Sequence, residues 1–108
     1  MMTDKELWIR MRKAAQNIAK EYDYEQEYEN DSRLTYNQAQ SYCFVTVVFH
    51  SNLDIRMIWQ NDNGYYALEI NYDTQKISRV WADDVKDPST SLLNLAVLIN
   101  TLERELDR

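Results

Sequence analysis

The sequence predicts an α+β fold, in which an antiparallel four-stranded β-meander is flanked by an N-terminal and a C-terminal helix as a two-layer sandwich. Apolar residues with helical spacing lie near both ends of the chain, and alternating patterns typical of strands occupy its middle. An Asn63–Gly64 pair, which strongly favours a hairpin turn, separates two of the alternating runs. At 108 residues the chain fits one α+β domain, 1–108, with the element order α-β-β-β-β-α.

The N-terminal helix is predicted from about Asp4 to Tyr22. Thr3 and Glu6 have the spacing of a capping box, in which the hydroxyl and the carboxylate satisfy amides of the first turn. The Glu and Gln residues beyond Tyr22 favour helix, but clustered acids oppose the dipole at a helix C-terminus, so an extension to Asn30 stays open. The apolar face consists of Leu7, Trp8, Met11, Ala14, Ala15, Ile18, Ala19 and Tyr22.

The middle of the chain is expected to form the four strands. Residues 32–40 are weakly patterned and fit a loop, a short helical turn or an edge strand. The first strand is apolar on both faces, which is typical of a central or doubly covered strand. The sequence does not decide which alternating set of side chains of the fourth strand faces the core, and one of the two choices would place Arg79 there. The predicted strands lie within Tyr42–His50, Leu53–Gln60, Tyr66–Tyr72 and Lys76–Trp81.

Two short turns predict the pairing of the central strands. A turn at Ser51–Asn52 places Thr46 opposite Met57, and a turn at Asn63–Gly64 places Met57 opposite Ile70. Both pairings put apolar side chains on one buried face. The reverse face is either covered by a helix or free to contact a partner. Its apolar members would be Val45, Val47, Phe49, Ile58, Ala67 and Val80, beside Arg56, Gln60 and Glu69.

The C-terminal helix is predicted to begin after Asp87, which suits an N-cap, with Pro88 at the first helical position. We expect this helix to pack on its own sheet, while Leu102 and Leu106 extend into a contact between two copies of the chain. The sequence therefore leaves open whether the chain forms a homodimer. The stripe with three-and-four spacing is Leu92, Leu95, Ile99, Leu102 and Leu106.

The composition argues against an enzyme, and we predict no catalytic, cofactor-binding or metal-binding residue. One His and one Cys supply too few ligands for zinc, and one Gly excludes a glycine-rich phosphate loop. His50 is expected to be a turn residue and Cys43 a buried, inert thiol. No apolar run approaches the ~18 residues of a membrane span, so a cytoplasmic protein is expected.

Residues 21–31, the acidic segment, hold the net charge of −6 in six acids without a Lys or Arg. This segment is expected within or just after the N-terminal helix. A calcium loop is disfavoured because Gln26 and Ser32 occupy positions that need Gly and Glu. The segment is then either a solvated helix end or a binding surface. If it is extended, its acids share one side at about 6.6–6.8 Å, close to the spacing of successive phosphates. The candidate partner-binding residues are Glu21, Asp23, Tyr24, Glu25, Glu27, Tyr28, Glu29 and Asp31.

The charge distribution predicts a protein that binds a basic protein partner. The hypothesis is a small acidic inhibitor of a nuclease toxin or of a restriction or CRISPR effector, by analogy with immunity proteins and phage-encoded nucleic acid mimics. Direct nucleic acid binding is not expected, because the only basic cluster is Arg10, Arg12 and Lys13. The alternatives are a dimeric chaperone or adaptor, and a domain that binds a small ligand between helix and sheet.

Overall fold

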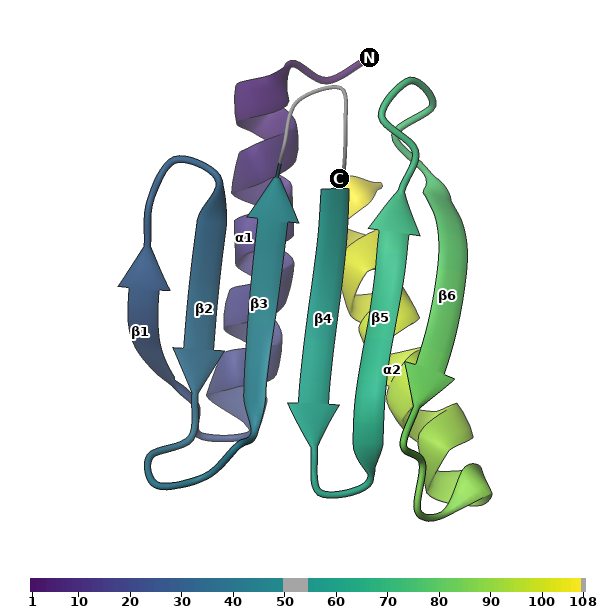
Figure 1. Cartoon of the computed structure of the whole chain (residues 1–108). Coiled ribbons are helices and arrows are strands. Elements are labelled where there is room, and N and C mark those ends of the chain that lie inside the picture. The colour runs from purple at the N-terminus through teal and green to yellow at the C-terminus, as the bar shows by residue number, and fades with distance from the viewer. Residues whose placement is uncertain (50–54, 108) are drawn as a thin grey trace.

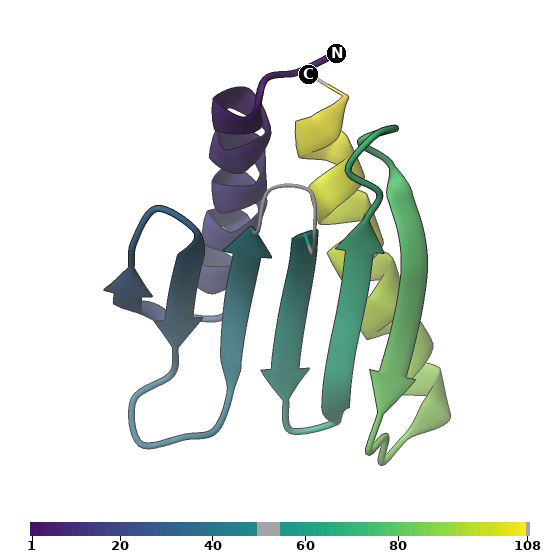
Figure 2. The ribbon, with the colours of Figure 1, turned by 45° about the horizontal axis from the view of Figure 1, so that its top comes forward.

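The computed structural model describes residues 1–49 and 55–107 and consists of a six-stranded antiparallel sheet with two helices (Figure 1). The strands follow one another across the sheet in sequence order. Both helices lie on the same face of the sheet, so the fold has two layers (Figures 1 and 2). The elements are α1 (Asp4–Glu21), β1 (Glu25–Glu29), β2 (Arg33–Asn37), β3 (Phe44–Phe49), β4 (Ile55–Asn61), β5 (Gly64–Ile70), β6 (Ile77–Asp83) and α2 (Pro88–Leu106).

The α+β class and the two flanking helices are confirmed, whereas the expected number of four strands is wrong. The two additional strands, β1 and β2, form a hairpin at one edge of the sheet (Figure 1). The acidic segment therefore lies mostly in a strand, and α1 ends at Glu21. Asp23 adopts a φ of 59°, a left-handed conformation that reverses the chain between α1 and β1.

Local signals explain the ends of both helices. The Thr3 hydroxyl accepts a hydrogen bond from the Glu6 amide at 3.1 Å, as the capping box predicts. The Asp87 carboxylate accepts hydrogen bonds from the Thr90 amide at 3.0 Å and the Thr90 hydroxyl at 2.5 Å. These two hydrogen bonds lower the pKa of Asp87, because they stabilise the ionised form. Both predicted helix starts are confirmed.

The β1–β2 hairpin is closed by the side chain of Asn30. Its Oδ1 accepts hydrogen bonds from the amides of Ser32 at 2.9 Å and Arg33 at 2.7 Å. An Asn side chain that satisfies amides two and three residues ahead imitates a backbone turn. The tight turn brings β1 back against β2 and makes β1 an edge strand of the sheet.

The predicted registers of the central strands are wrong, although the buried face of β4 and β5 is confirmed. Val47 lies opposite Met57, which shifts the β3–β4 pairing by one residue. Met57 lies opposite Leu68, because the β4–β5 turn is closed by Asn61 and Gly64. The turn predicted at Ser51–Asn52 lies outside the described residues.

The one-residue shift moves side chains of β3 to the other face. Val45, Val47 and Phe49 lie opposite buried residues of β4 on the helix side, not on the reverse face. Val80 also lies on the helix side, opposite Leu68. Arg79 lies opposite Glu69, away from the core.

The hydrophobic core lies between the sheet and the two helices. Trp59 and Tyr66 are the largest fully buried side chains, and they lie opposite each other on β4 and β5. The core also includes Leu7, Met11, Ile18, Leu34, Val45, Val47, Ile55, Met57, Leu68, Leu98 and Leu102. Both helices cover this one face, so neither of them covers the other face of the sheet (Figure 2).

Candidate partner-binding surfaces

The acids of the acidic segment lie in three structural settings. Glu21 ends α1, Asp23 lies in the following turn, and Asp31 lies in the β1–β2 turn. The other three acids belong to β1, whose five residues are all exposed. All six acids are exposed residues.

A β-bulge divides the acids of β1 between the two sides of the sheet. The register shifts between Gln26 and Tyr28, so simple alternation fails at Glu27. Glu29 lies opposite Leu34, a core residue, and its carboxylate forms an ion pair with Arg12 of α1 at 2.5 Å. The expectation that all six acids share one side of an extended segment is therefore wrong.

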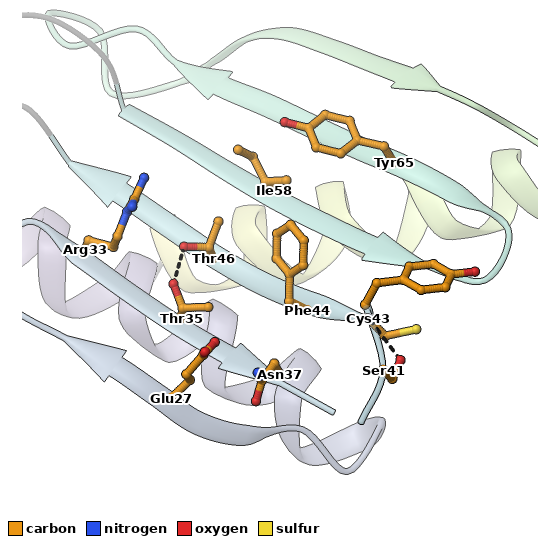
Figure 3. Close-up of a pocket in the computed structure, with 11 residues that line it drawn as sticks. Glu27, Arg33, Thr35, Asn37, Ser41, Cys43, Phe44, Thr46, Ile58 and Tyr65 are labelled. Atoms are coloured by element: carbon orange, nitrogen blue, oxygen red, sulfur yellow. Dashed lines mark hydrogen bonds between the residues drawn. The ribbon is translucent and has the colours of Figure 1, made fainter. Parts of the chain in front are cut away.

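Glu25 and Glu27 are directed to the side opposite the helices. Glu25 lies opposite Asn37, and Asn37 and Glu27 both line a pocket on the uncovered face of the sheet (Figure 3). Among the described residues, neither carboxylate forms an ion pair or a hydrogen bond. These two acids therefore have their full charge available to a partner.

The two candidate tyrosines have different settings. The Tyr24 hydroxyl accepts a hydrogen bond from Nε1 of the buried Trp59 at 3.2 Å, and burial raises the pKa of Tyr24. Tyr28 is 49% exposed, and its hydroxyl accepts a hydrogen bond from Asn30 at 2.9 Å. Tyr24 thus ties the start of β1 to the core, whereas the Tyr28 ring is accessible.

The second candidate surface is the open face, the side of the sheet that neither helix covers (Figures 1 and 2). Its central row runs across five strands. The hydroxyls of Thr35 and Thr46 are 2.8 Å apart, and Thr46 donates to the carbonyl oxygen of Leu34 at 3.0 Å. These bonds satisfy the buried Thr46 side chain. The row consists of Thr35, Thr46, Ile58, Ala67 and Trp81.

A shallow pocket of about 350 Å³ lies on the open face (Figure 3). The Phe44 and Tyr65 rings and the Ile58 side chain form its apolar part, and Glu27 and Arg33 lie at its rim. Thr35, Asn37, Ser41, Tyr42, Cys43 and Thr46 complete the lining. The alternative of a ligand cavity between helix and sheet does not describe this pocket, because it lies on the face away from the helices.

Three arginines lie in a row across one end of the open face. Arg33 of β2, Arg56 of β4 and Arg79 of β6 share a cross-strand row with Val48 and Glu69. Arg56 forms an ion pair with Glu69 at 3.0 Å. The guanidiniums of Arg79 and Arg56 lie 4.4 Å and 5.8 Å from the centre of the Trp81 ring. We call the three residues the arginine row.

The sequence analysis missed the arginine row because its members are far apart in sequence. Arg33 lies in the stretch that had no clear pattern, and Arg79 was ambiguous in parity. Only Arg56 was placed correctly, on the reverse face beside Glu69. The alternation of Arg56 with the buried Ile55 and Met57 was the available signal, and strand pairing was needed to bring Arg56 and Arg79 together.

A third surface is the exposed part of α2. Leu92 and Leu93 are 71% and 68% exposed. Leu102 is fully buried within its own chain, so the expectation that it extends into a contact between two copies is wrong, and Leu106 is half-buried. The exposed leucines lie on the helical layer, away from the open face (Figure 2).

Within 1–49 and 55–107, no group of three His, Cys, Asp or Glu side chains could hold a metal ion. Cys43 is buried, and its Sγ lies 3.6 Å from the Asp62 carboxylate. His50 lies outside the described residues.

Among the described helices, none is long and apolar enough to cross a membrane.

Comparison with known proteins gives no relative: no family model matches the sequence, and neither the curated proteins nor the solved structures contain a match. The surfaces described above are therefore the basis for inferring a function.

Proposed function

We propose that the chain is a non-enzymatic inhibitor that binds a basic protein through the acidic segment. The exposed acidic edge of the sheet is the observation that supports this most directly. All five residues of β1 are exposed, and Glu25 and Glu27 make no ion pair within the described part of the chain. An unscreened cluster of one sign favours a partner of the opposite sign and accelerates encounter with it.

The partner that fits this surface best is a nuclease or another nucleic-acid-binding effector. Such proteins gather Lys and Arg in the groove that receives phosphate. The bulge removes Glu29 from the binding set, since its carboxylate is paired with Arg12. Five of the six acids therefore remain as proposed contact residues, and Tyr28 is the proposed aromatic contact. The five acids are Glu21, Asp23, Glu25, Glu27 and Asp31.

The test compares two variants that each remove two negative charges. The binding variant is Glu25→Gln with Glu27→Gln, and the control is Asp73→Asn with Glu103→Gln, two exposed acids outside the acidic segment. Proteins captured from the source cells at low salt are identified, and association rates are measured for the basic ones. The binding variant should associate more slowly, with a shallower salt dependence, while the control should match the wild type. Equal rates for all three proteins would remove the acidic segment from the function.

A dimeric adaptor is the second candidate function, and the exposed Leu92 and Leu93 favour it. Adjacent large apolar side chains on a helix are typical of interfaces. Leu93→Glu should then convert a dimer to a monomer in sedimentation experiments without loss of helical signal. A wild-type chain that sediments as a monomer at all concentrations would exclude this candidate.

A further inference from the structure

We propose that the open face of the sheet is a second docking surface, which binds an acidic protein segment with apolar side chains. The first argument is the exposure of an apolar centre. Both helices lie on the other side of the sheet, and half-buried side chains crowd the open face (Figures 1 and 3). An uncovered apolar patch with a polar rim is typical of a protein interface. Its members are Phe44, Val48, Ile58, Tyr65 and Trp81.

The second argument is the charge of the arginine row. The cross-strand row itself holds three arginines and one glutamate, so it has an excess of positive charge. Arg33 is exposed, and its guanidinium forms no ion pair or hydrogen bond within the described residues. Its charge is therefore available, and a carboxylate from a partner is the group that a guanidinium binds best in protein interfaces.

The third argument is that Trp81, an aromatic side chain of the open face, is already held in place by a neighbouring arginine. Arg79 is held over the Trp81 ring at 4.4 Å, so both side chains are already partly ordered before a partner arrives. Ordering long side chains is one of the main costs of association. Tryptophan and arginine side chains are also the residues that most often dominate binding energy in interfaces.

The spacing of charges on the face distinguishes between two kinds of acidic partner. Strands are about 4.8 Å apart, so arginines on alternate strands lie about 10 Å from one another. The opposite end of the same face is acidic, with Glu25, Glu27 and Asp83. A nucleic acid strand has a phosphate at every nucleotide and would meet these acids. A protein segment can place its carboxylates at the arginine row and uncharged side chains elsewhere.

The test is selection from a displayed library of random peptides by the whole protein. The wild type should enrich peptides that combine Asp or Glu with large apolar residues. The variant Arg33→Gln with Arg79→Gln should bind these peptides at least about tenfold more weakly. The control Lys13→Gln with Lys20→Gln removes the same charge from exposed positions on α1 and should bind as the wild type does. If the double arginine variant does not fold, the single Arg33→Gln variant replaces it, because the Arg33 guanidinium forms no ion pair or hydrogen bond with residues 1–49 and 55–107.

Three outcomes would overturn the proposal. The first is no enrichment of acidic peptides, and the second is enrichment that the arginine variant leaves unchanged. The third is tight binding of a short labelled single-stranded RNA or DNA that depends on Arg33 and Arg79. That result would show that the open face binds nucleic acid. Basic peptides, if enriched, should instead depend on Glu25 and Glu27. The same selection thus reports separately on this surface and on the acidic segment.

Discussion

The assignment of the two sheet faces can be tested at one pair of neighbouring residues. Met57 and Ile58 follow one another in β4, so their side chains project to opposite faces. Met57 is fully buried between Val47 and Leu68. Ile58 lies on the open face and is only half-buried. Replacing each residue with alanine should therefore lower the free energy of unfolding by unequal amounts.

The magnitude follows from burial. Removing a fully buried Met side chain deletes its transfer free energy and leaves a cavity, which together cost about 2–5 kcal/mol. The Ile58→Ala change removes fewer buried methyl groups and leaves a space that is open to solvent. Its loss in free energy of unfolding should therefore stay below about 1.5 kcal/mol. At about 4–8 °C per kcal/mol for a domain near this size, a loss of about 3 kcal/mol for Met57→Ala lowers Tm by about 12–24 °C.

The measurement is urea and thermal unfolding by far-ultraviolet circular dichroism, with unchanged m-values required for both variants. Met57→Asp should abolish folding, because an unpaired charge in the core costs several kcal/mol, while Ile58→Asp should stay folded. An Ile58→Ala loss equal to or larger than that of Met57→Ala would refute the assignment of the faces. A folded, cooperative Met57→Asp variant would refute it as well.

Further predictions concern the edge strand and the helices. Glu29→Gln should destabilise the fold by up to about 1 kcal/mol through loss of the partly exposed Arg12 ion pair, and Arg12→Gln should add nothing to that loss in a double-mutant cycle of urea unfolding. Leu102→Ala should cost about 2–5 kcal/mol and Leu92→Ala less than about 0.5 kcal/mol, measured in the same way. Asp87→Ala should lower Tm at neutral pH. Because the folded pKa of Asp87 is lowered, its stabilisation is present above the unfolded pKa, so the Tm difference should shrink as the pH falls below about 4.

The helices could be predicted from the sequence because their signals are local. Thr3 with Glu6, and Asp87 with Pro88, mark helix starts within a few residues, and spacing of three and four marks the buried stripes. The stripe of α2 was predicted less well. Leu92 follows the spacing but is exposed, because the side of the helix that packs against α1 and the sheet holds Ser91, Leu98 and Leu102.

The missing strands and the wrong registers have physical causes. Glu and Gln in β1 favour helix intrinsically, and pairing with β2 overrides that preference. A strand such as β3, apolar on both faces, does not indicate by itself which face is buried. The register must then come from the turn, and a shift of one residue reverses every side chain. In the acidic segment the bulge at Glu27 had no sequence signal, so the separation of Glu29 from Glu25 could not be foreseen.

The acidic edge strand also has a consequence for self-assembly. A free sheet edge is a template on which a second copy can add a strand, and repeated addition leads to aggregates. Two β1 strands side by side would bring together Glu25 and Glu27 of both copies, whose carboxylates form no ion pair within the described residues, and their repulsion opposes that addition. Acidification into the range where carboxylates take up protons removes this repulsion. We therefore expect light scattering to rise at low pH before the circular dichroism signal is lost. The Glu25→Gln, Glu27→Gln variant should scatter more than the Asp73→Asn, Glu103→Gln control even at neutral pH.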